Sequence, residues 1–121
     1  MILVTVNKPK QILLLSFIGR VRAEELADGF QDMAAFLSEL SPGFRLVSDL
    51  CPAESLDKDC AKEIAKAMEL CDQKGVGLVV RVIPDGSKDI GLNILALFHY
   101  TRRPRTVTCP NMLEAAKALE I

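Results

Sequence analysis

The stretch Phe44-Arg-Leu-Val-Ser-Asp-Leu50, together with the residues that follow it, decides the fold of this chain. It is an apolar run that ends in Asp49, passes through a short loop containing Pro52, and leads into residues 57–74. In that last segment apolar side chains recur at helical spacing, at Cys60, Ile64, Ala67, Met68 and Cys71. The stretch therefore predicts a strand followed by a helix, and such a junction is where an open α/β sheet usually binds its ligands.

The residues before this junction predict a β-hairpin and a helix. Residues 2–6 alternate in polarity and residues 11–18 are more continuously apolar, with turn chemistry around Pro9 between them. Residues 23–40 then predict one amphipathic helix, since their apolar residues share a helical stripe. The members of that stripe are Leu26, Phe30, Met33, Leu37 and Leu40.

The residues after the junction predict two more strands and two more helices. Residues 77–83 are nearly all apolar and β-branched, which is typical of a strand covered on both faces, and we expect them at the centre of the sheet. A helix over 88–100, a short strand over 105–108 and a last helix over 111–119 follow. The last helix is expected to dock on the sheet through Met112, Leu113, Ala116 and Leu119.

The order of these elements is β-β-α-β-α-β-α-β-α, which requires crossover helices between parallel strands. The sequence therefore predicts a single α/β domain over residues 1–121, with a mixed five-stranded sheet and about four helices. An antiparallel N-terminal hairpin makes the sheet mixed. A chain of 121 residues suits one domain and requires no second one.

Composition narrows the classes of partner. The formal charge of −1 gives no broad attraction to nucleic acid or to an anionic membrane, and no segment is long and apolar enough for a signal peptide or a membrane span. We therefore expect a cytoplasmic protein. Its four cysteines form no CxxC pair, so buried thiols are expected rather than disulfides, a zinc site or any other metal site, and no cofactor is implied.

In this order of elements and in the junction after Asp49, the chain resembles the STAS family and its stand-alone bacterial relatives. The family is named for sulfate transporters and anti-sigma-factor antagonists. The resemblance extends over the hairpin, the Leu15-Ser-Phe-Ile-Gly19 segment, the strand ending in Asp49, and Gly75-Val-Gly-Leu-Val-Val80. It implies a non-enzymatic protein-interaction module in bacterial regulation, whose partner is an anti-sigma-type kinase or a related regulator.

The family motif is a strand ending Asp-Leu-Ser, then Asp-Ser-Ser-Gly at the start of the next helix, where a serine is phosphorylated. Here Asp49, Leu50 and Asp57 match, while Lys58 and Asp59 occupy the two hydroxyl positions and Cys60 the glycine position. The resemblance thus implies partner binding without the usual phosphoacceptor. The expected partner-binding residues are Cys51, Ser55, Asp57, Lys58 and Asp59, with Ser55 the nearest remaining hydroxyl. Asp57 also has the position of a helix N-cap.

Two further hypotheses start from other residues. In residues 88–100, Leu92, Leu95 and His99 lie opposite a first apolar face, so a neighbouring helix, a second copy of the chain or another partner would cover them. That surface could instead admit a small apolar ligand or lipid, which would require a sizeable cavity beside it. An enzyme would require Cys51 and His99 to converge on one pocket, because Cys51 lies near a helix N-terminus that can lower a thiol pKa.

Overall fold

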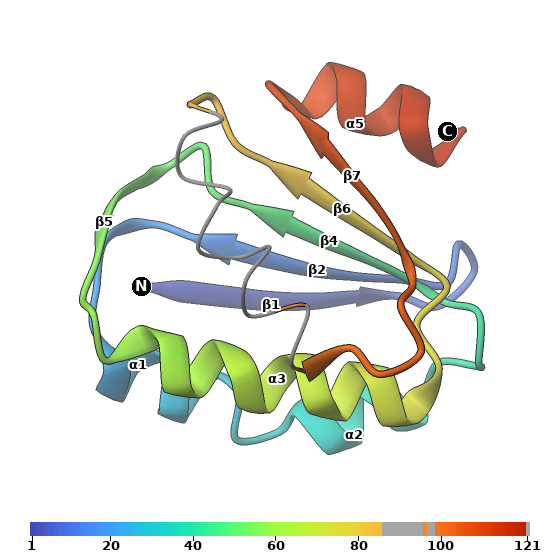
Figure 1. Cartoon of the computed structure of the whole chain (residues 1–121), viewed down its shortest axis with the longest axis horizontal. Coiled ribbons are helices and arrows are strands. Elements are labelled where there is room, and N and C mark those ends of the chain that lie inside the picture. The colour runs from blue at the N-terminus through green and yellow to red at the C-terminus, as the bar shows by residue number, and fades with distance from the viewer. Residues whose placement is uncertain (86–95, 97–98, 121) are drawn as a thin grey trace.

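The computed structural model of the chain describes residues 1–85, 96 and 99–120. Its main sheet has five strands in the order β1-β2-β4-β6-β7 (Figure 1). Their bounds are Ile2–Asn7 for β1, Ile12–Phe17 for β2, Arg45–Asp49 for β4, Leu78–Val82 for β6 and Arg105–Cys109 for β7. β1 pairs antiparallel with β2, and every later neighbour pairs in parallel. The predicted mixed sheet with an N-terminal hairpin is confirmed.

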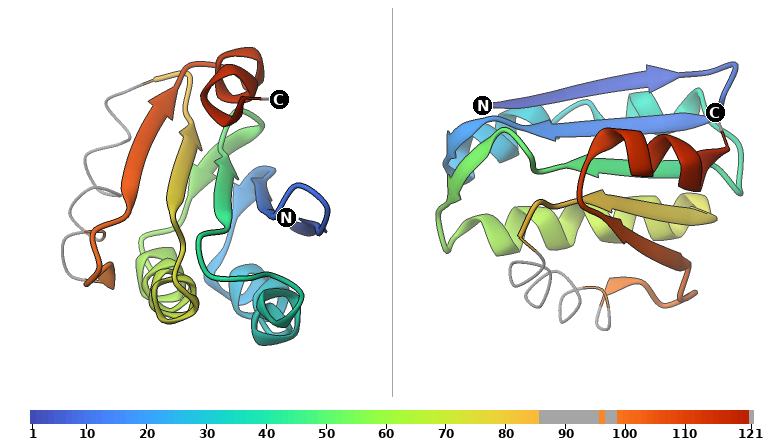
Figure 2. Two further views of the ribbon diagram at one scale, coloured as in Figure 1. Left: turned by 90° about the vertical axis from the view of Figure 1, so that its right-hand side faces the viewer. Right: turned by 90° about the horizontal axis from the view of Figure 1, so that it is seen from above.

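Helices cover both faces of this sheet. Three of them, α1 (Ala23–Gly29), α2 (Met33–Ser38) and α3 (Cys60–Lys74), lie on one face, and α5 (Met112–Leu119) lies on the other (Figure 2). The larger apolar core fills the space between the sheet and α1 to α3, and a smaller one lies under α5. The stripe predicted for α3 faces the larger core, since Cys60, Met68 and Cys71 are buried there.

The position of the apolar strand differs from the prediction. β6 is buried on both faces as expected, but β4 is the central strand and β6 lies between it and β7. The stretch that decides the fold therefore also occupies the middle of the sheet. The C-terminal ends of β2, β4, β6 and β7 all point toward the same edge, because these strands are parallel.

The single helix predicted over 23–40 is wrong, because the chain breaks it after Gly29 and resumes it at Met33. Glycine is a poor helix former. Here its missing side chain also lets β1 approach, since a Cβ on Gly29 would overlap Cγ2 of Ile2. The residues of the predicted stripe still reach the core, with Leu26 and Met33 fully buried.

The last helix begins where the sequence predicts, with the Asn111 side chain accepting a hydrogen bond from the N–H of Glu114 at 2.9 Å. Its predicted docking stripe is partly wrong. Ala115 and Leu119 are buried against the sheet, whereas Met112 is 43% exposed and Leu113 is 67% exposed. The start fixed by Asn111 sets the rotation of the helix, and that rotation points the 115/119 pair inward.

The helix predicted over 88–100 lies mostly outside the described residues, although Ala96 and His99 are helical. Leu92 and Leu95 also lie outside them, so the surface predicted there stays a prediction. Within residues 1–85, 96 and 99–120, no helix has the length and apolar character needed to cross a bilayer.

Candidate functional site

The end of β4 forms a tight turn organised by Asp49. Its Oδ1 accepts a hydrogen bond from the N–H of Cys51 at 3.0 Å, and the N–H of Leu50 bonds to the carbonyl of Val82 at 2.9 Å. These two bonds direct the chain away from the sheet and leave Cys51 exposed. The predicted junction therefore begins where the sequence places it.

The segment after this turn is a short strand that the sequence reasoning took for a loop. β5 (Ala53–Leu56) pairs in parallel with β3 (Gly19–Val21), which also went unpredicted. Backbone bonds close both ends of this small ladder, from the N–H of Gly19 to the carbonyl of Pro52 at 2.9 Å and from the N–H of Asp57 to the carbonyl of Val21 at 3.0 Å. The ladder holds residues 53–56 in a defined conformation and presents Ser55 on the surface.

The start of α3 differs in detail from the prediction. The N-cap is Asp59, with no hydrogen bond from its side chain to the helix, and the helix begins at Cys60. Asp57 does not cap the helix through its side chain as predicted. Its carbonyl accepts the N–H of Cys60 at 2.9 Å, and its carboxylate lies 3.7 Å from Nε of Arg20. The reason is the β3–β5 ladder, which positions Asp57 as the last residue before a turn.

The five predicted partner-binding residues are brought together in one continuous segment at the surface. Cys51, Ser55, Lys58 and Asp59 are exposed and Asp57 is half-buried. The segment lies at the edge where the parallel strands end, between β4 and the first turn of α3 (Figure 1). Carboxylates at that turn suit the positive end of the helix dipole.

Cys51 lacks the features of a reactive thiol. Although Cys51 is exposed, partial loss of hydration at the turn raises the pKa of its thiol, and the hydrogen bond and charge of Asp49 raise that pKa further. This is opposite to the lowered pKa expected from a nearby helix N-terminus. A thiol with a raised pKa stays protonated at neutral pH and is a poor nucleophile.

His99 lies far from Cys51 along α3. Its Nδ1 is 2.6 Å from Oε1 of Glu69, which stands nine residues after the first residue of the helix, Cys60. At a rise of about 1.5 Å per residue, that separation is roughly 14 Å along the helix axis. Cys51 precedes the helix start, whereas His99 lies beside the third turn of α3, so the described residues do not show the convergence that the enzyme hypothesis requires.

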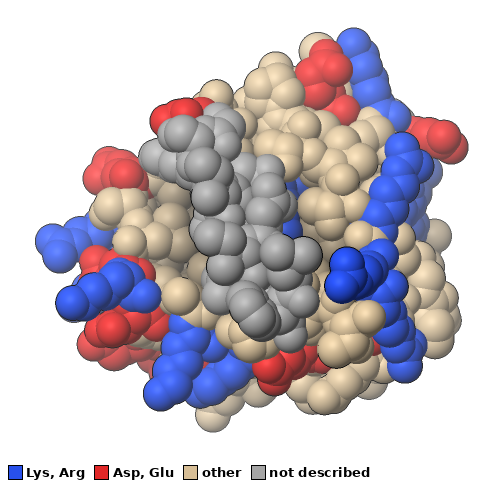
Figure 3. All heavy atoms as spheres, viewed as in Figure 1, with Lys and Arg blue, Asp and Glu red and all other residues tan. Residues whose placement is uncertain are grey.

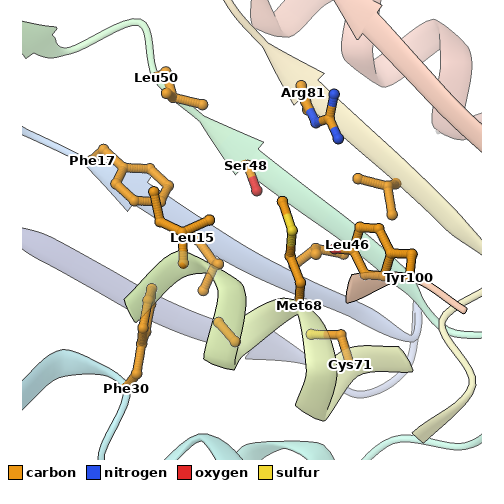
Figure 4. A pocket seen from close by; sticks show the side chains of 13 residues that line it. Leu15, Phe17, Phe30, Leu46, Ser48, Leu50, Met68, Cys71, Arg81 and Tyr100 are labelled. Carbon is orange, nitrogen blue, oxygen red and sulfur yellow. The ribbon is translucent and has the colours of Figure 1, made fainter. Parts of the chain in front are cut away.

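A small pocket lies between α3 and the sheet (Figure 4). Apolar side chains such as Leu15, Phe17 and Met68 make most of its wall, and Ser48, Arg81 and Tyr100 add polar groups. Its volume is about 30 Å³. Arg81 is only 2% exposed, and burial raises the pKa of Tyr100 well above its usual range. Sequence reasoning did not single out Arg81. The one feature that could have indicated it is that a single cation stands within an otherwise apolar, β-branched run.

The cysteines do not suggest a metal site. Cys60, Cys71 and Cys109 are buried, and all four thiols are free. Burial raises the pKa of Cys71 to about 12. Across the described part of the chain, no group of three histidine, cysteine or carboxylate side chains is arranged to hold a metal ion.

Comparison with solved structures identifies the fold. An uncharacterised protein of the DUF3478 family from Shewanella loihica, described as having a SpoIIAA-like fold, matches with a TM-score of 0.71 and 13% identity, over 98% of this chain and 92% of that one. The anti-sigma factor antagonist SpoIIAA in its unphosphorylated form matches with a TM-score of 0.63 and 9% identity, over 99% and 98% of the two chains.

An anti-sigma factor antagonist from Mycobacterium paratuberculosis matches with a TM-score of 0.62 and 21% identity, over all of this chain and 94% of that one. No family profile matches the sequence, and no curated protein is significantly similar to it. The chain therefore has a SpoIIAA-like, or STAS-like, fold, as the sequence predicts.

Proposed function

We propose that this protein is a non-enzymatic interaction module of bacterial regulation that acts in the cytoplasm, in the manner of an anti-sigma factor antagonist. Its recognition surface is formed by Cys51, Ser55, Asp57, Lys58 and Asp59. The observation that carries this proposal is the β3–β5 ladder, which holds the segment in a fixed conformation at the sheet edge. A surface that is ordered before binding loses less conformational entropy when a partner docks.

The chemistry of the surface points to binding without a phosphorylation switch. Lys58 and Asp59 provide permanent charges at the helix start, where a phosphoacceptor serine would receive a variable charge. Ser55, the nearest hydroxyl, lies on β5 before the helix turn. The partner is then a protein, such as an anti-sigma-type kinase or a related regulator, whose binding does not depend on the phosphorylation state of this turn.

The test exchanges the two charges at the start of α3. Lys58→Glu combined with Asp59→Lys keeps the net charge of the chain and leaves the buried residues untouched. We expect the immobilised double variant to retain a partner captured from native cytoplasm about tenfold more weakly than the unaltered chain, because each reversed charge meets a like charge in the partner. The thermal midpoint should change by no more than a few degrees, since both side chains are exposed.

A matched control exchanges a charge pair on α5. Glu114 and Lys117 are 3.2 Å apart, and Glu114→Lys with Lys117→Glu preserves both the pair and the net charge. This control should capture the partner normally. If the α3 variant and the α5 control captured the partner equally well, or lost it equally, residues 51–59 would not be the recognition surface.

A carrier of a small apolar ligand at the surface of Leu92, Leu95 and His99 is the alternative, although Leu92 and Leu95 lie outside the described residues. The observation in its favour is the apolar pocket between α3 and the sheet, which Tyr100, the neighbour of His99, helps to line. Its volume of about 30 Å³ is far below the several hundred Å³ of sites for drug-sized molecules. The described residues therefore support this alternative less well than the interaction module.

A further inference from the structure

The edge of the sheet opposite the recognition surface carries a concentration of positive charge. Here the parallel strands begin, and Ile12, Arg45, Leu78 and Arg105 are neighbours across four strands. Exposed cations from the β1–β2 turn and from the segment that leads into β7 both lie at this edge, which we call the basic end. Its members are Lys8, Lys10, Arg102, Arg103 and Arg105.

Neither the net charge of −1 nor the linear sequence reveals this local excess of cations, because the five residues come from two segments far apart in the chain. In Figure 3 Lys and Arg side chains line most of the right-hand edge of the molecule, with Asp and Glu side chains beside them in its upper part. That edge corresponds to the start of β2, β4, β6 and β7 in Figure 1. Glu39 and Glu120 also end helices near this edge, so the five cations outnumber the exposed carboxylates of these helix ends.

The fold holds the basic end in place. Asp72, buried on α3, accepts hydrogen bonds from the Thr101 hydroxyl at 2.7 Å and from the N–H of Arg102 at 3.1 Å. Arg103 has a φ of 49°, which is unfavourable for a residue with a side chain and marks a tightly constrained turn. The backbone that carries Arg102 and Arg103 is therefore held in one conformation.

The lysine side of the basic end is also supported. The Arg45 side chain donates to the carbonyl of Lys10 at 2.6 Å and to the carbonyl of Leu119 at 2.5 Å. It thereby ties the β1–β2 turn to the end of α5. Arg45 is used for this support, while Lys8 and Lys10 are exposed.

The chemistry of the basic end narrows the kind of partner. Phe44 precedes Arg45 and Tyr100 precedes the 102–105 segment, but both rings are buried and neither can stack on a nucleic-acid base. Among residues 1–85, 96 and 99–120, the exposed large apolar residues are Met1, Leu3, Met112 and Leu113, which lie at β1 and at the start of α5. Stable membrane attachment needs an apolar anchor beside the charges, and the basic end does not supply one.

We propose that the basic end binds an acidic protein segment, a run of aspartate and glutamate residues. Arginine and lysine pair well with carboxylates, and arginine can do so through two parallel hydrogen bonds. The four strands from β2 to β7 span about 14 Å at their usual spacing. An extended run of about five acidic residues would bridge that distance. This site is separate from the recognition surface and goes beyond the proposed function.

The test uses a fluorescein-labelled peptide of eight glutamates and the full chain, at 150 mM salt, with fluorescence anisotropy as the readout. We expect saturable binding, and about tenfold weaker binding by Arg102→Glu with Arg105→Glu, because each reversal removes an attraction and adds a repulsion. A control, Lys62→Glu with Lys66→Glu on α3, changes the net charge equally and should bind within about twofold of the unaltered chain. Lys8→Glu with Lys10→Glu repeats the test in the β1–β2 turn if the arginine variant is unfolded by circular dichroism.

Three results would overturn the proposal. One is the absence of peptide binding by the unaltered chain. A second is equal weakening in the control, which would show a response to net charge alone. The third is tighter binding of a twelve-nucleotide DNA strand or of phosphatidylserine vesicles than of the peptide, which would assign the basic end to another class of partner.

Discussion

Asp72 shows how a single residue links the two halves of the chain. Burial alone would raise the pKa of this carboxyl, but the hydrogen bonds from Thr101 and from the backbone of Arg102 lower it below its ordinary value. The charged form is therefore the one that the folded state stabilises. Through it, α3 holds the segment that leads into β7.

Removing that charge should destabilise the fold in a pH-dependent way. We expect Asp72→Asn to lower the free energy of unfolding by about 1–3 kcal/mol at pH 7, because the amide has one oxygen acceptor for two part-buried hydrogen bonds and lacks the charge that strengthens both. The folded-state pKa lies below the unfolded value of 3.8, so this contribution is present above pH 3.8 and fades as the pH falls through the folded-state pKa. Urea unfolding followed by circular dichroism at pH 7 and pH 3 measures both effects.

Asp28→Asn, on the exposed side of α1, is the control and should change stability little at either pH. A difference between Asp72→Asn and the unaltered chain that is as large at pH 3 as at pH 7 would contradict the role assigned to the ionised carboxylate.

At the scale of elements, the break between α1 and α2 depends on one close approach. Gly29 leaves room for Ile2, and β1 packs across the end of α1 because of it. The sequence shows Gly29 in the middle of a regular apolar stripe, and the stripe predicts a continuous helix. The contact with β1 determines that the helix ends at Gly29. The periodicity of apolar residues carries no information about such a long-range contact.

A double-mutant cycle tests this packing. Gly29→Ala should destabilise the fold by about 1–3 kcal/mol through overpacking against Ile2. In an Ile2→Ala background the same change should be neutral or favourable, because the overlap is gone and alanine favours helix by about 1 kcal/mol. Denaturant unfolding of the four proteins gives the coupling energy, and additive effects would exclude the contact as the cause of the break.

For the whole molecule, sequence reasoning succeeded where the information is local. The apolar runs of β4 and β6 and the helical stripe of α3 are each made of residues close together in the sequence. They were enough to predict a mixed five-stranded sheet and the fold, although not which strand is central. It failed where segments far apart meet. The pairing of Gly19–Val21 with Ala53–Leu56 and the placement of Lys8 and Arg105 at the same end of the sheet depend on the fold.

The candidate site was predicted only in part for the same reason. The segment 51–59 was found because its residues are consecutive and match a family pattern, whereas the role of Asp57 depends on Arg20, which β3 brings to it. Arg81 was missed because a strand buried on both faces gives no pattern that distinguishes one inward position from another.

The central claim is that a partner docks on residues 51–59 and the first turn of α3. Hydrogen exchange of the complex with its captured partner, measured by mass spectrometry against the free chain, tests it most directly. We expect slower exchange in peptides covering Cys51 to Asp59 and the start of α3, with unchanged exchange in α5. Protection confined to α5 and β1, with no change over residues 51–59, would contradict the account.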